Sequence, residues 1–413
     1  MPEVTLPIAG QTPVPASRIA AAEGANAPSS AEAVIPWSLA DWRGLYAHVP
    51  FCRHKCHYCD FYSFVDREDR GAAYVDRLAA ECSALRGHVS TPLETIFVGG
   101  GTPTMLPPGE LERALSALAS LAQLGLGGEF TVEANPETVT DDIAGVLVGC
   151  GVNRVSIGCQ SFQPSLLTAL ERHHDPASVA RAVGILRRAG ITNINLDLIF
   201  AVPTSRLEQW HDDLDRAVAL EPEHISCYGL VYEPNTPLAT RLARGEVQRI
   251  DEVLEGRMYE HARAVLAAHG YQHYEISNWA RPGRRCQHNL LYWRNADWLA
   301  LGPSASGHSA GVRWKNVPRL SDWLSSSPWT LVQDVECLDA EASAGEQFML
   351  GLRLIDGLDK ADLERLLAMP GGARRRAVIE RLCRGGLLLS DAAGLRIVPS
   401  KLMVADSVIS ELL

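Results

Sequence analysis

Short apolar segments rich in β-branched residues alternate with amphipathic segments of helical period from residue 45 onwards. Six apolar segments fit buried strands: residues 45–51, 94–100, 129–135, 154–160, 193–200 and 224–230. Four amphipathic segments fit helices that cover such strands: residues 72–87, 109–123, 177–190 and 207–220. Strands that alternate with helices at this spacing form βα units and a parallel sheet. The pattern therefore predicts an α/β protein with a partial (β/α)6 barrel of the TIM type.

Polar residues and glycines recur where the predicted strands end. Gly100, Gly101 and Thr102 follow the second strand, and Glu133, Gln160, Asp197 and Tyr228 fall at or near the ends of the next four. The carboxyl ends of the strands form the active face of a β/α barrel. Any one of these residues also fits an ordinary hydrogen-bonding role at a strand end. Their recurrence at successive strands indicates a ligand-binding rim.

The chain changes character near residue 275. Six of the nine tryptophans lie between residues 279 and 329, which predicts an aromatic layer that either packs on the barrel or holds something flat. Helical segments, a hairpin at 386–400 and a last helix at 401–413 then predict a helical, winged-helix-like domain. We therefore expect a barrel domain at 44–274 and a C-terminal domain at 275–413. Residues 1–43, rich in Ala, Pro, Ser and Gly, are expected to be a disordered extension.

The net charge of -11 argues against nucleic acid as the main partner, because proteins that neutralise phosphates usually carry excess Lys and Arg. Arg374, Arg375 and Arg376 are accordingly expected to lie on a solvated helix face. The sequence shows neither an apolar run long enough to span a bilayer nor a secretory signal. We therefore expect a cytoplasmic protein without stable membrane insertion.

Three cysteines, Cys52, Cys56 and Cys59, fall within eight positions directly after the first predicted strand. The other seven cysteines are scattered singly, so they do not form a disulfide framework. Exposed thiols this close together would oxidise, so a metal site is the better explanation.

Two kinds of metal site fit three neighbouring thiols. A structural zinc ion needs four ligands, and His48, His54 or His57 could supply the fourth. A 4Fe-4S cluster is the alternative, since thiolates are its preferred ligands and three cysteines leave one iron open for chemistry. The position of the triplet at the active rim of the predicted barrel favours the cluster.

The C-x3-C-x2-C spacing of "CRHKCHYC" resembles the radical S-adenosylmethionine (SAM) family, in which the open iron binds SAM. The segments "YAHVPFC", "VGGGTPT", "GCQSF" and "NLDLIF" narrow the resemblance to the group containing oxygen-independent coproporphyrinogen III oxidase and the HemW haem chaperones. It extends from residue 46 to the C-terminus. It implies a 4Fe-4S cluster, an electron donor that reduces the cluster, and SAM as cofactor. The implied cofactor contacts are Tyr46, Tyr58, Gly100, Gly101, Thr102, Glu133, Gln160, Arg172 and Asp197.

Two features distinguish the chaperone type from the oxidase type. The oxidase is expected to carry a further cysteine two positions after the third, where this chain has Phe61. The segment 282–293 contains the H-N-x-x-Y-W element that is typical of the chaperones. A haem needs an axial donor and flat apolar surroundings, so His288 is the candidate ligand and Cys286 a weaker one. His288 would otherwise bond a backbone group within an aromatic core.

One loop departs from the family pattern. Relatives usually have a glycine-containing loop like "GLPGQT" after the fifth strand, whereas this chain has "AVPTSR" at 201–206. Ala and Thr then stand where positive φ or close backbone approach favours glycine.

The resemblance therefore implies a haem chaperone that binds a 4Fe-4S cluster, SAM and haem and transfers haem to acceptor proteins. The enzyme alternative is coproporphyrinogen III dehydrogenation in porphyrin biosynthesis by radical SAM chemistry. A third alternative, nucleic-acid binding through the C-terminal domain, is disfavoured by the acidic chain. The sequence leaves open the haem acceptor and the oligomeric state.

Overall fold

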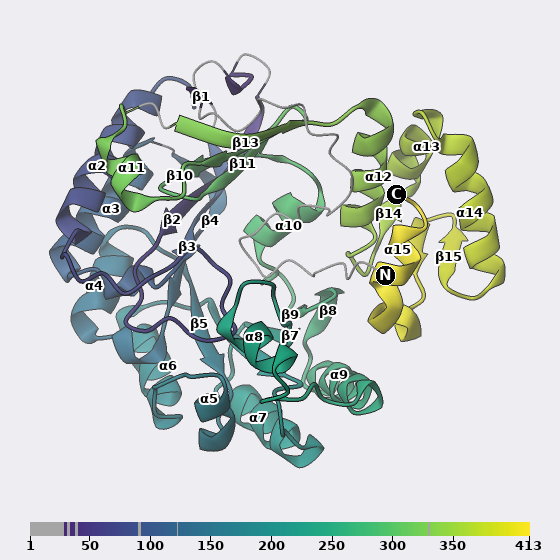
Figure 1. Cartoon of the computed structure of the whole chain (residues 1–413), viewed down its shortest axis with the longest axis horizontal. Coiled ribbons are helices and arrows are strands. Elements are labelled where there is room, and N and C mark those ends of the chain that lie inside the picture. Colours follow the sequence, from purple (N-terminus) through teal and green to yellow (C-terminus); the bar gives the residue numbers. More distant parts are fainter. Residues whose placement is uncertain (1–28, 31–33, 38–39, 90–91, 122, 329–330) are drawn as a thin grey trace.

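The computed structural model describes residues 29–30, 34–37, 40–89, 92–121, 123–328 and 331–413. At its centre lies a sheet whose six inner strands are parallel and follow one another in chain order (Figure 1). These strands are β2 (Trp42–Val49), β3 (Leu93–Gly100), β4 (Leu124–Ala134), β5 (Arg154–Gln160), β6 (Ile194–Phe200) and β7 (His224–Gly229). The predicted partial (β/α)6 barrel is therefore confirmed.

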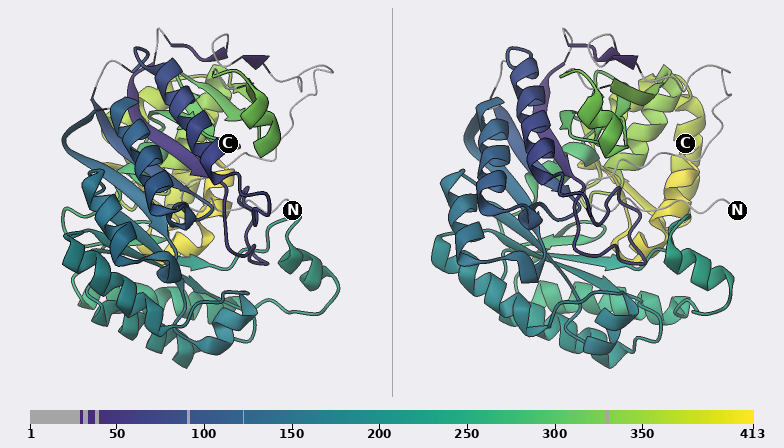
Figure 2. Two further views of the ribbon diagram at one scale, coloured as in Figure 1. Left: turned by 90° about the vertical axis from the view of Figure 1, so that its left-hand side faces the viewer. Right: turned by 60° about the vertical axis from the view of Figure 1, so that its left-hand side comes forward.

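Helices form a layer around the outside of the curved sheet (Figure 2). They include α2 (Gly71–Leu85), α3 (Pro108–Leu121), α4 (Asp141–Gly149), α6 (Ala177–Ala189), α7 (Leu207–Ala219) and α9 (Glu252–Ala268). In α7, Trp210, Leu214 and Ala217 are buried at the spacing of one helix face, which packs this helix on the sheet. The four predicted helices are confirmed to within two residues at each end. The sequence pattern missed α4 and α9.

The sheet continues beyond the six barrel strands on both sides. At one edge, β10 (Asp297–Leu301) pairs in parallel with β2, and β11 (Ser306–Ser309), β12 (Val312–Asn316) and β13 (Leu331–Cys337) extend it. At the other edge, β9 (Asn278–Ala280) pairs antiparallel with β7, followed by β8 (Gln272–Glu275). An open barrel has two unpaired edges, and these later strands cover both. The domain boundary at residue 275 therefore falls inside one continuous sheet and stays a prediction.

Most of the clustered tryptophans belong to the core. Trp279, Trp298, Trp314 and Trp323 are at most 2% exposed. Their burial supports the packing alternative over a surface slot for a flat ligand. Trp329 lies outside the described residues.

The C-terminal region is a helical module with a small sheet. It contains α12 (Ala340–Gly351), α13 (Lys360–Ala368), α14 (Gly372–Arg384) and α15 (Ala405–Ser410), with strands β14 (Leu358–Asp359), β15 (Leu388–Asp391) and β16 (Gly394–Ile397). The predicted hairpin is β15–β16, and β14 adds a third strand. Figure 1 shows this module on the side of the molecule opposite to α2, α3 and α4. The winged-helix-like arrangement is therefore confirmed.

One of the three arginines predicted to lie on a solvated helix face is buried, so the prediction is wrong for that residue. Arg375 is 1% exposed. Its guanidinium donates hydrogen bonds to the backbone carbonyls of Leu412, Pro370 and Glu341 at 2.8 to 2.9 Å. It thus ties the C-terminal residues to α12 and α14, while its neighbour Arg374 is exposed as expected. A planar group with five donors can satisfy several carbonyls at once, which explains why arginine is tolerated there.

Little of the N-terminal extension is described. Ser29–Ser30 form β1 and pair with β13; most of the segment expected to be disordered lies outside the described residues. Among the helices that the structure describes, none is both long and apolar enough to cross a bilayer.

Candidate functional site

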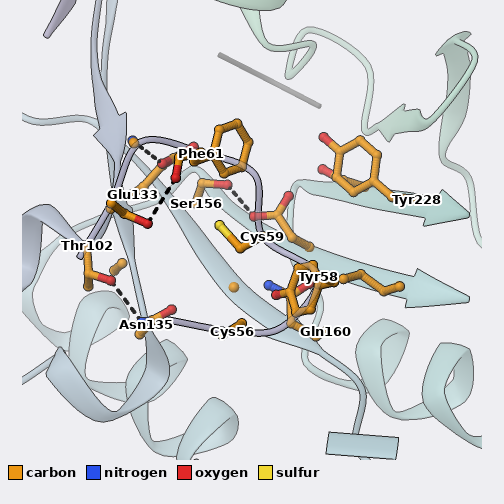
Figure 3. A pocket seen from close by; sticks show the side chains of 18 of the residues that line it. Cys56, Tyr58, Cys59, Phe61, Thr102, Glu133, Asn135, Ser156, Gln160 and Tyr228 are labelled. Carbon is orange, nitrogen blue, oxygen red and sulfur yellow. Dashed lines mark hydrogen bonds between the residues drawn. The ribbon is translucent and has the colours of Figure 1, made fainter. Parts of the chain in front are cut away.

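A cavity opens at the carboxyl ends of the barrel strands, at the rim where the sequence predicts a binding site (Figure 3). Its lining comes from the loop after β2 that carries the three cysteines, from β3 to β7 and the segments that follow them, and from the start of α10 (Gln287–Trp293) with the residue before it. Of the predicted site residues, those at the cavity are Cys52, Cys56, Cys59, Tyr58, Gly100, Gly101, Thr102, Glu133, Gln160, Arg172 and Asp197. Tyr46 and His288 are not among its lining residues.

The cysteine loop is held by its own backbone and by Lys55. The amide of Cys52 donates to the carbonyl of Phe64 at 3.0 Å, which closes the loop at its base. Lys55 donates to the Phe61 carbonyl and to Ser63 Oγ, and its ammonium lies 3.9 Å from the sulfur of Cys59. The loop is therefore folded back toward the cavity with a cation beside its thiols.

Burial has the largest effect on the pKa values of Cys52 and Cys59. It raises the pKa of Cys59 to about 11 and that of Cys52 above its ordinary value, while the charge of Lys55 lowers both. Iron binds the thiolate, so metal uptake at this loop must release protons. Positive charge, from Lys55 and from bound iron, is what favours thiolates in such a buried place.

The histidines near the loop are engaged elsewhere. His48 lies between the Tyr62 carbonyl, 2.7 Å from Nε2, and the Tyr46 hydroxyl, 3.0 Å from Nδ1. His54 and His57 both face the carboxylate of Glu171 at 3.4 Å. None of the three completes a tetrahedral set with the cysteines.

The grouping of the thiols bears on the choice of metal site. Within the part of the chain that the structure describes, no three His, Cys, Asp or Glu side chains are close enough to share one metal ion. A structural zinc ion takes four protein ligands, whereas a cubane with one open iron takes three thiolates. Three cysteines on one loop match the donor set of the cluster, because His48, His54 and His57 face other groups.

Gly100 and Gly101 have packing reasons to be glycine. Gly100 has φ of 106°, and a Cβ there would meet the ring of His48 at 2.4 Å. A Cβ on Gly101 would meet the carbonyl oxygen of Phe51 at 2.6 Å. The amides of Gly101 and Thr102 donate to the carbonyls of Val49 and Phe51, which joins the segment after β3 to the end of β2 and the start of the cysteine loop. These glycines let two loops of the rim come together, and Thr102 lies beside Cys52 with Oγ1 3.8 Å from its sulfur.

Two acidic side chains face the cavity from β4 and β6. Glu133 accepts a hydrogen bond from the amide of Gly100 at 3.0 Å, and Asp197 accepts from Ser156 Oγ at 2.9 Å and Asn195 Nδ2 at 2.8 Å. Burial, and then the nearby charge of Asp197, raise the pKa of Glu133 to about 8. Glu133 is therefore mainly protonated at neutral pH and can donate as well as accept a hydrogen bond there.

Arg172 links the cysteine loop to the end of β5. Its guanidinium donates to Asn135 Oδ1 at 2.6 Å and to the Gly158 carbonyl at 2.7 Å, and lies 3.8 Å from the sulfur of Cys56. Burial raises the pKa of Tyr58 and the charge of Arg172 lowers it. Arg172 thus places one positive charge at the mouth of the cavity, beside the thiols.

His288 and Tyr46 lie in an aromatic layer beneath the cavity wall. The ring of His288 is fully buried between Thr95 and Tyr292 and stacks with Phe97 at 5.0 Å between ring centroids. Burial lowers its pKa to about 3, so the imidazole is neutral. Its neighbours along the chain, Cys286 and Asn289, reach the cavity instead.

Sequence reasoning missed several cavity residues. Phe97, Asn135, Arg154, Ser156 and Asn289 line the cavity without having been singled out as contacts. Asn135 directly follows β4 and donates to Thr102 Oγ1 at 2.9 Å, so the strand-end rule could have found it (Figure 3). Arg154 begins a strand instead of ending one, and only the alternation of β5 points it inward.

The departing loop at 201–206 does not line the cavity. Ala201 and Thr204 have φ of 59° and 67°, the left-handed region that favours glycine. The two non-glycine residues therefore carry backbone strain in a segment that follows β6 and contributes no residue to the cavity wall.

The sequence of the chain matches a known family and several named proteins. A family model described as the Radical SAM superfamily matches residues 46–217. The chain is 37% identical to Heme chaperone HemW of Lactococcus lactis, over 76% of this chain and 82% of that protein. It is 35% identical to Heme chaperone HemW of Mycobacterium tuberculosis, over 90% of this chain and 94% of the relative.

The fold of the chain has a solved counterpart. The structure of Escherichia coli coproporphyrinogen III oxidase (HemN), a radical SAM enzyme, matches 89% of each chain with a TM-score of 0.77. At 21% identity this likeness shows the fold alone. Fold and cysteine loop together define a protein of the radical SAM class. The extended identity to the curated relatives shows that the chain belongs to the HemW family within that class.

Proposed function

We propose that this protein is a haem chaperone that carries a 4Fe-4S cluster on Cys52, Cys56 and Cys59, binds SAM in the barrel cavity, and passes haem to acceptor proteins. The observation that carries the proposal is the 37% identity to a relative named Heme chaperone HemW over 82% of that relative. Phe61, where the oxidase type is expected to have a further cysteine, supports the chaperone over the oxidase.

The cavity supports cofactor binding residue by residue. The loop offers three thiols and leaves a fourth coordination position without a protein donor, which suits an iron that binds a ligand of its own. Arg172 and Asp197 place a cation and an anion at the same cavity, suited to a carboxylate and to a hydroxyl or amine respectively. Bound to the cluster, SAM would supply one-electron chemistry, and these side chains would orient it and exclude water. An electron donor and a cytoplasmic location belong to the same proposal.

His288 is our candidate haem ligand. Both of its ring nitrogens are hydrogen-bonded in this structure, to Thr95 and Tyr292. To reach an iron, the ring would have to give up one of these bonds and α10 would have to shift. Cys286 already lines the cavity, but burial raises the pKa of its thiol to about 12, which disfavours a thiolate ligand.

Coproporphyrinogen III dehydrogenation is the second candidate function. The predicted SAM contacts that line the cavity would serve this reaction as well, because radical chemistry needs the same bound SAM. The test is anaerobic: the cluster is reconstituted, dithionite, SAM and coproporphyrinogen III are added, and protoporphyrinogen is sought by chromatography.

In parallel, haemin-loaded protein is mixed with apo-forms of haem proteins. A chaperone transfers haem to them faster than haem dissociates from it into buffer. No product from fully loaded protein, together with such accelerated transfer, supports the chaperone. Multiple turnover would favour the oxidase.

A further inference from the structure

Arg154 is a buried cation without a hydrogen-bond partner among the described residues. It is 2% exposed and lines the barrel cavity. Its nearest acidic group is Glu129, whose Oε2 lies 4.0 Å from Nε, and Nε itself is buried without a partner. A guanidinium has five donors, and a buried polar group left unsatisfied is costly. An arginine in this state therefore calls for a partner that the protein chain does not supply.

Glu129 is not that partner, because its oxygens are used elsewhere. It accepts hydrogen bonds from the amides of Gln287 and His288 at 3.1 and 3.3 Å, and from the thiol of Cys286 at 3.5 Å. Glu129 thus fixes the start of α10 against β4. It offsets the charge of Arg154 at longer range but does not saturate its donors.

Asn289 is a second unsatisfied group at the same cavity. It is 6% exposed, lines the cavity, and its Oδ1 is buried without a partner in the described part of the chain. The oxygen and the NH2 of a carboxamide exchange places when the amide turns by 180°, so this position can present a donor to a ligand. Asn289 stands three residues after Cys286, which also lines the cavity. Two elements far apart in the sequence, β5 and α10, therefore direct unpaired polar side chains into one space.

Arg154 lies further from the cysteine loop than Arg172 does, although its charge acts on Glu133 and Asp197. It is the first residue of β5, on the same face as Ser156, which Figure 3 shows in the cavity wall. Gly158, whose carbonyl accepts from Arg172, lies four residues and about 13 Å further along the same strand. Arg172, beside Cys56, already places a cation at the mouth. The cavity thus has one arginine at each end.

We propose that Arg154 and Asn289 form a carboxylate-binding subsite at the deep end of the cavity. A guanidinium matches a carboxylate in a two-point contact, and a carboxamide NH2 adds a further donor. Haem carries two such carboxylates on its propionate side chains, and a propionate is therefore the occupant we infer. The amino-acid end of SAM is not, because the open iron of the proposed cluster binds SAM beside the cysteine loop. The inference rests on the proposed function, because it takes the cavity to be where the ligand binds.

The experiment compares haemin with a version that lacks free carboxylates. Cluster-loaded protein is titrated with haemin and with haemin dimethyl ester, and separately with SAM. In the wild type we expect haemin to bind about ten- to a hundredfold more tightly than its ester. Arg154→Met should abolish that preference, and Asn289→Ala should reduce it. Arg181→Met, which removes an exposed arginine of α6, is the matched control.

Removing Arg154 leaves Glu129 without its nearby cation, so Arg154→Met is also made together with Glu129→Gln. Melting temperature and iron content show whether each variant is folded and loaded. A haemin preference that Arg154→Met loses while its SAM affinity stays that of the wild type assigns the subsite to a propionate. A loss of SAM affinity with the haemin preference unchanged would overturn that assignment.

Equal binding of haemin and its dimethyl ester by the wild type would overturn the subsite while leaving the proposed function intact. Retention of the wild-type preference by the folded double variant would overturn it as well. A cluster-loaded wild type that binds neither haemin nor SAM would instead refute the proposed function.

Discussion

His288 and Tyr292 lie one turn apart on α10, and the Nε2 atom of His288 is 2.8 Å from the Tyr292 hydroxyl. The other ring nitrogen, Nδ1, is 2.7 Å from Thr95 Oγ1 on β3. The histidine of the H-N-x-x-Y-W element is thus satisfied on both sides and joins α10 to the barrel. Any role as a haem ligand competes with these two bonds.

This competition predicts opposite effects for two substitutions. Tyr292→Phe frees Nε2, so haemin should bind more tightly if His288 is the ligand, and His288→Ala should weaken binding. If His288 is only structural, both variants should leave haemin affinity unchanged in folded protein. The loss of a buried hydrogen bond should lower stability by about 1–3 kcal/mol. Haemin titration with a melting curve for each variant separates the two roles.

The three loop cysteines should be individually necessary for the cluster. Cys52→Ser, Cys56→Ser and Cys59→Ser should each lower the iron content from about four per chain toward zero, because an alkoxide does not replace a thiolate ligand here. Cys337→Ser is the matched control, since Cys337 is free and exposed. Iron and sulfide analysis after anaerobic reconstitution measures the effect. Full iron content in all three variants would refute the ligand assignment.

Glu81 should make the stability of the fold depend on pH. It is 1% exposed on α2, accepts from the amide of Gly302 at 3.1 Å, and burial raises its pKa to about 7. The carboxyl of Glu81 keeps its proton to higher pH in the folded state than in the unfolded state. Its contribution to the free energy of unfolding is therefore fully present below about pH 4.5 and is lost as pH rises through 7.

Glu81→Gln should remove this pH-dependent loss of stability, because glutamine does not ionise. Relative to the wild type, the variant should gain about 1–3 kcal/mol in unfolding free energy between pH 5 and pH 8. Melting curves at both pH values test this, with Glu112→Gln on the exposed face of α3 as control. A wild-type minus variant difference that does not change with pH would contradict the assignment.

The strain in the departing loop predicts a stabilising substitution. Thr204 is exposed and has φ of 67°, which costs a β-branched residue about 1–2 kcal/mol. Thr204→Gly removes this strain but adds conformational freedom to the unfolded chain, so we expect a net gain of up to about 1 kcal/mol. Arg319→Gly, at an exposed position with φ of -70°, should lower stability instead. A fall in melting temperature for Thr204→Gly would show that the loop is not strained.

The sequence predicted those features that depend on residues close together along the chain. Strand and helix periodicity located the six barrel strands, and the rule that strand ends form the active face placed Glu133, Gln160 and Asp197 at the cavity. Arg154 escaped this rule because it begins a strand. Arg375 was assigned to a solvated face because nothing in its neighbours in sequence shows that it contacts Leu412.

The sequence also did not predict which strands pair when they lie far apart along the chain. The pairing of β10 with β2 joins Leu299 to Leu45, and no periodic pattern marks two such short segments as partners. The same holds for the site: the motif drew attention to His288, whereas the fold turns its neighbour Asn289 into the cavity. Only the three-dimensional arrangement shows which residue of a motif faces a ligand.

The central claim is that this chain binds haem while it holds its cluster, and haemin titration of the cluster-loaded protein tests it most directly. The Soret band is followed anaerobically as haemin is added, with iron content measured on the same sample. The account predicts saturable binding of about one haem per chain, retained when SAM is present. Fully loaded protein whose Soret band stays that of free haemin would contradict it.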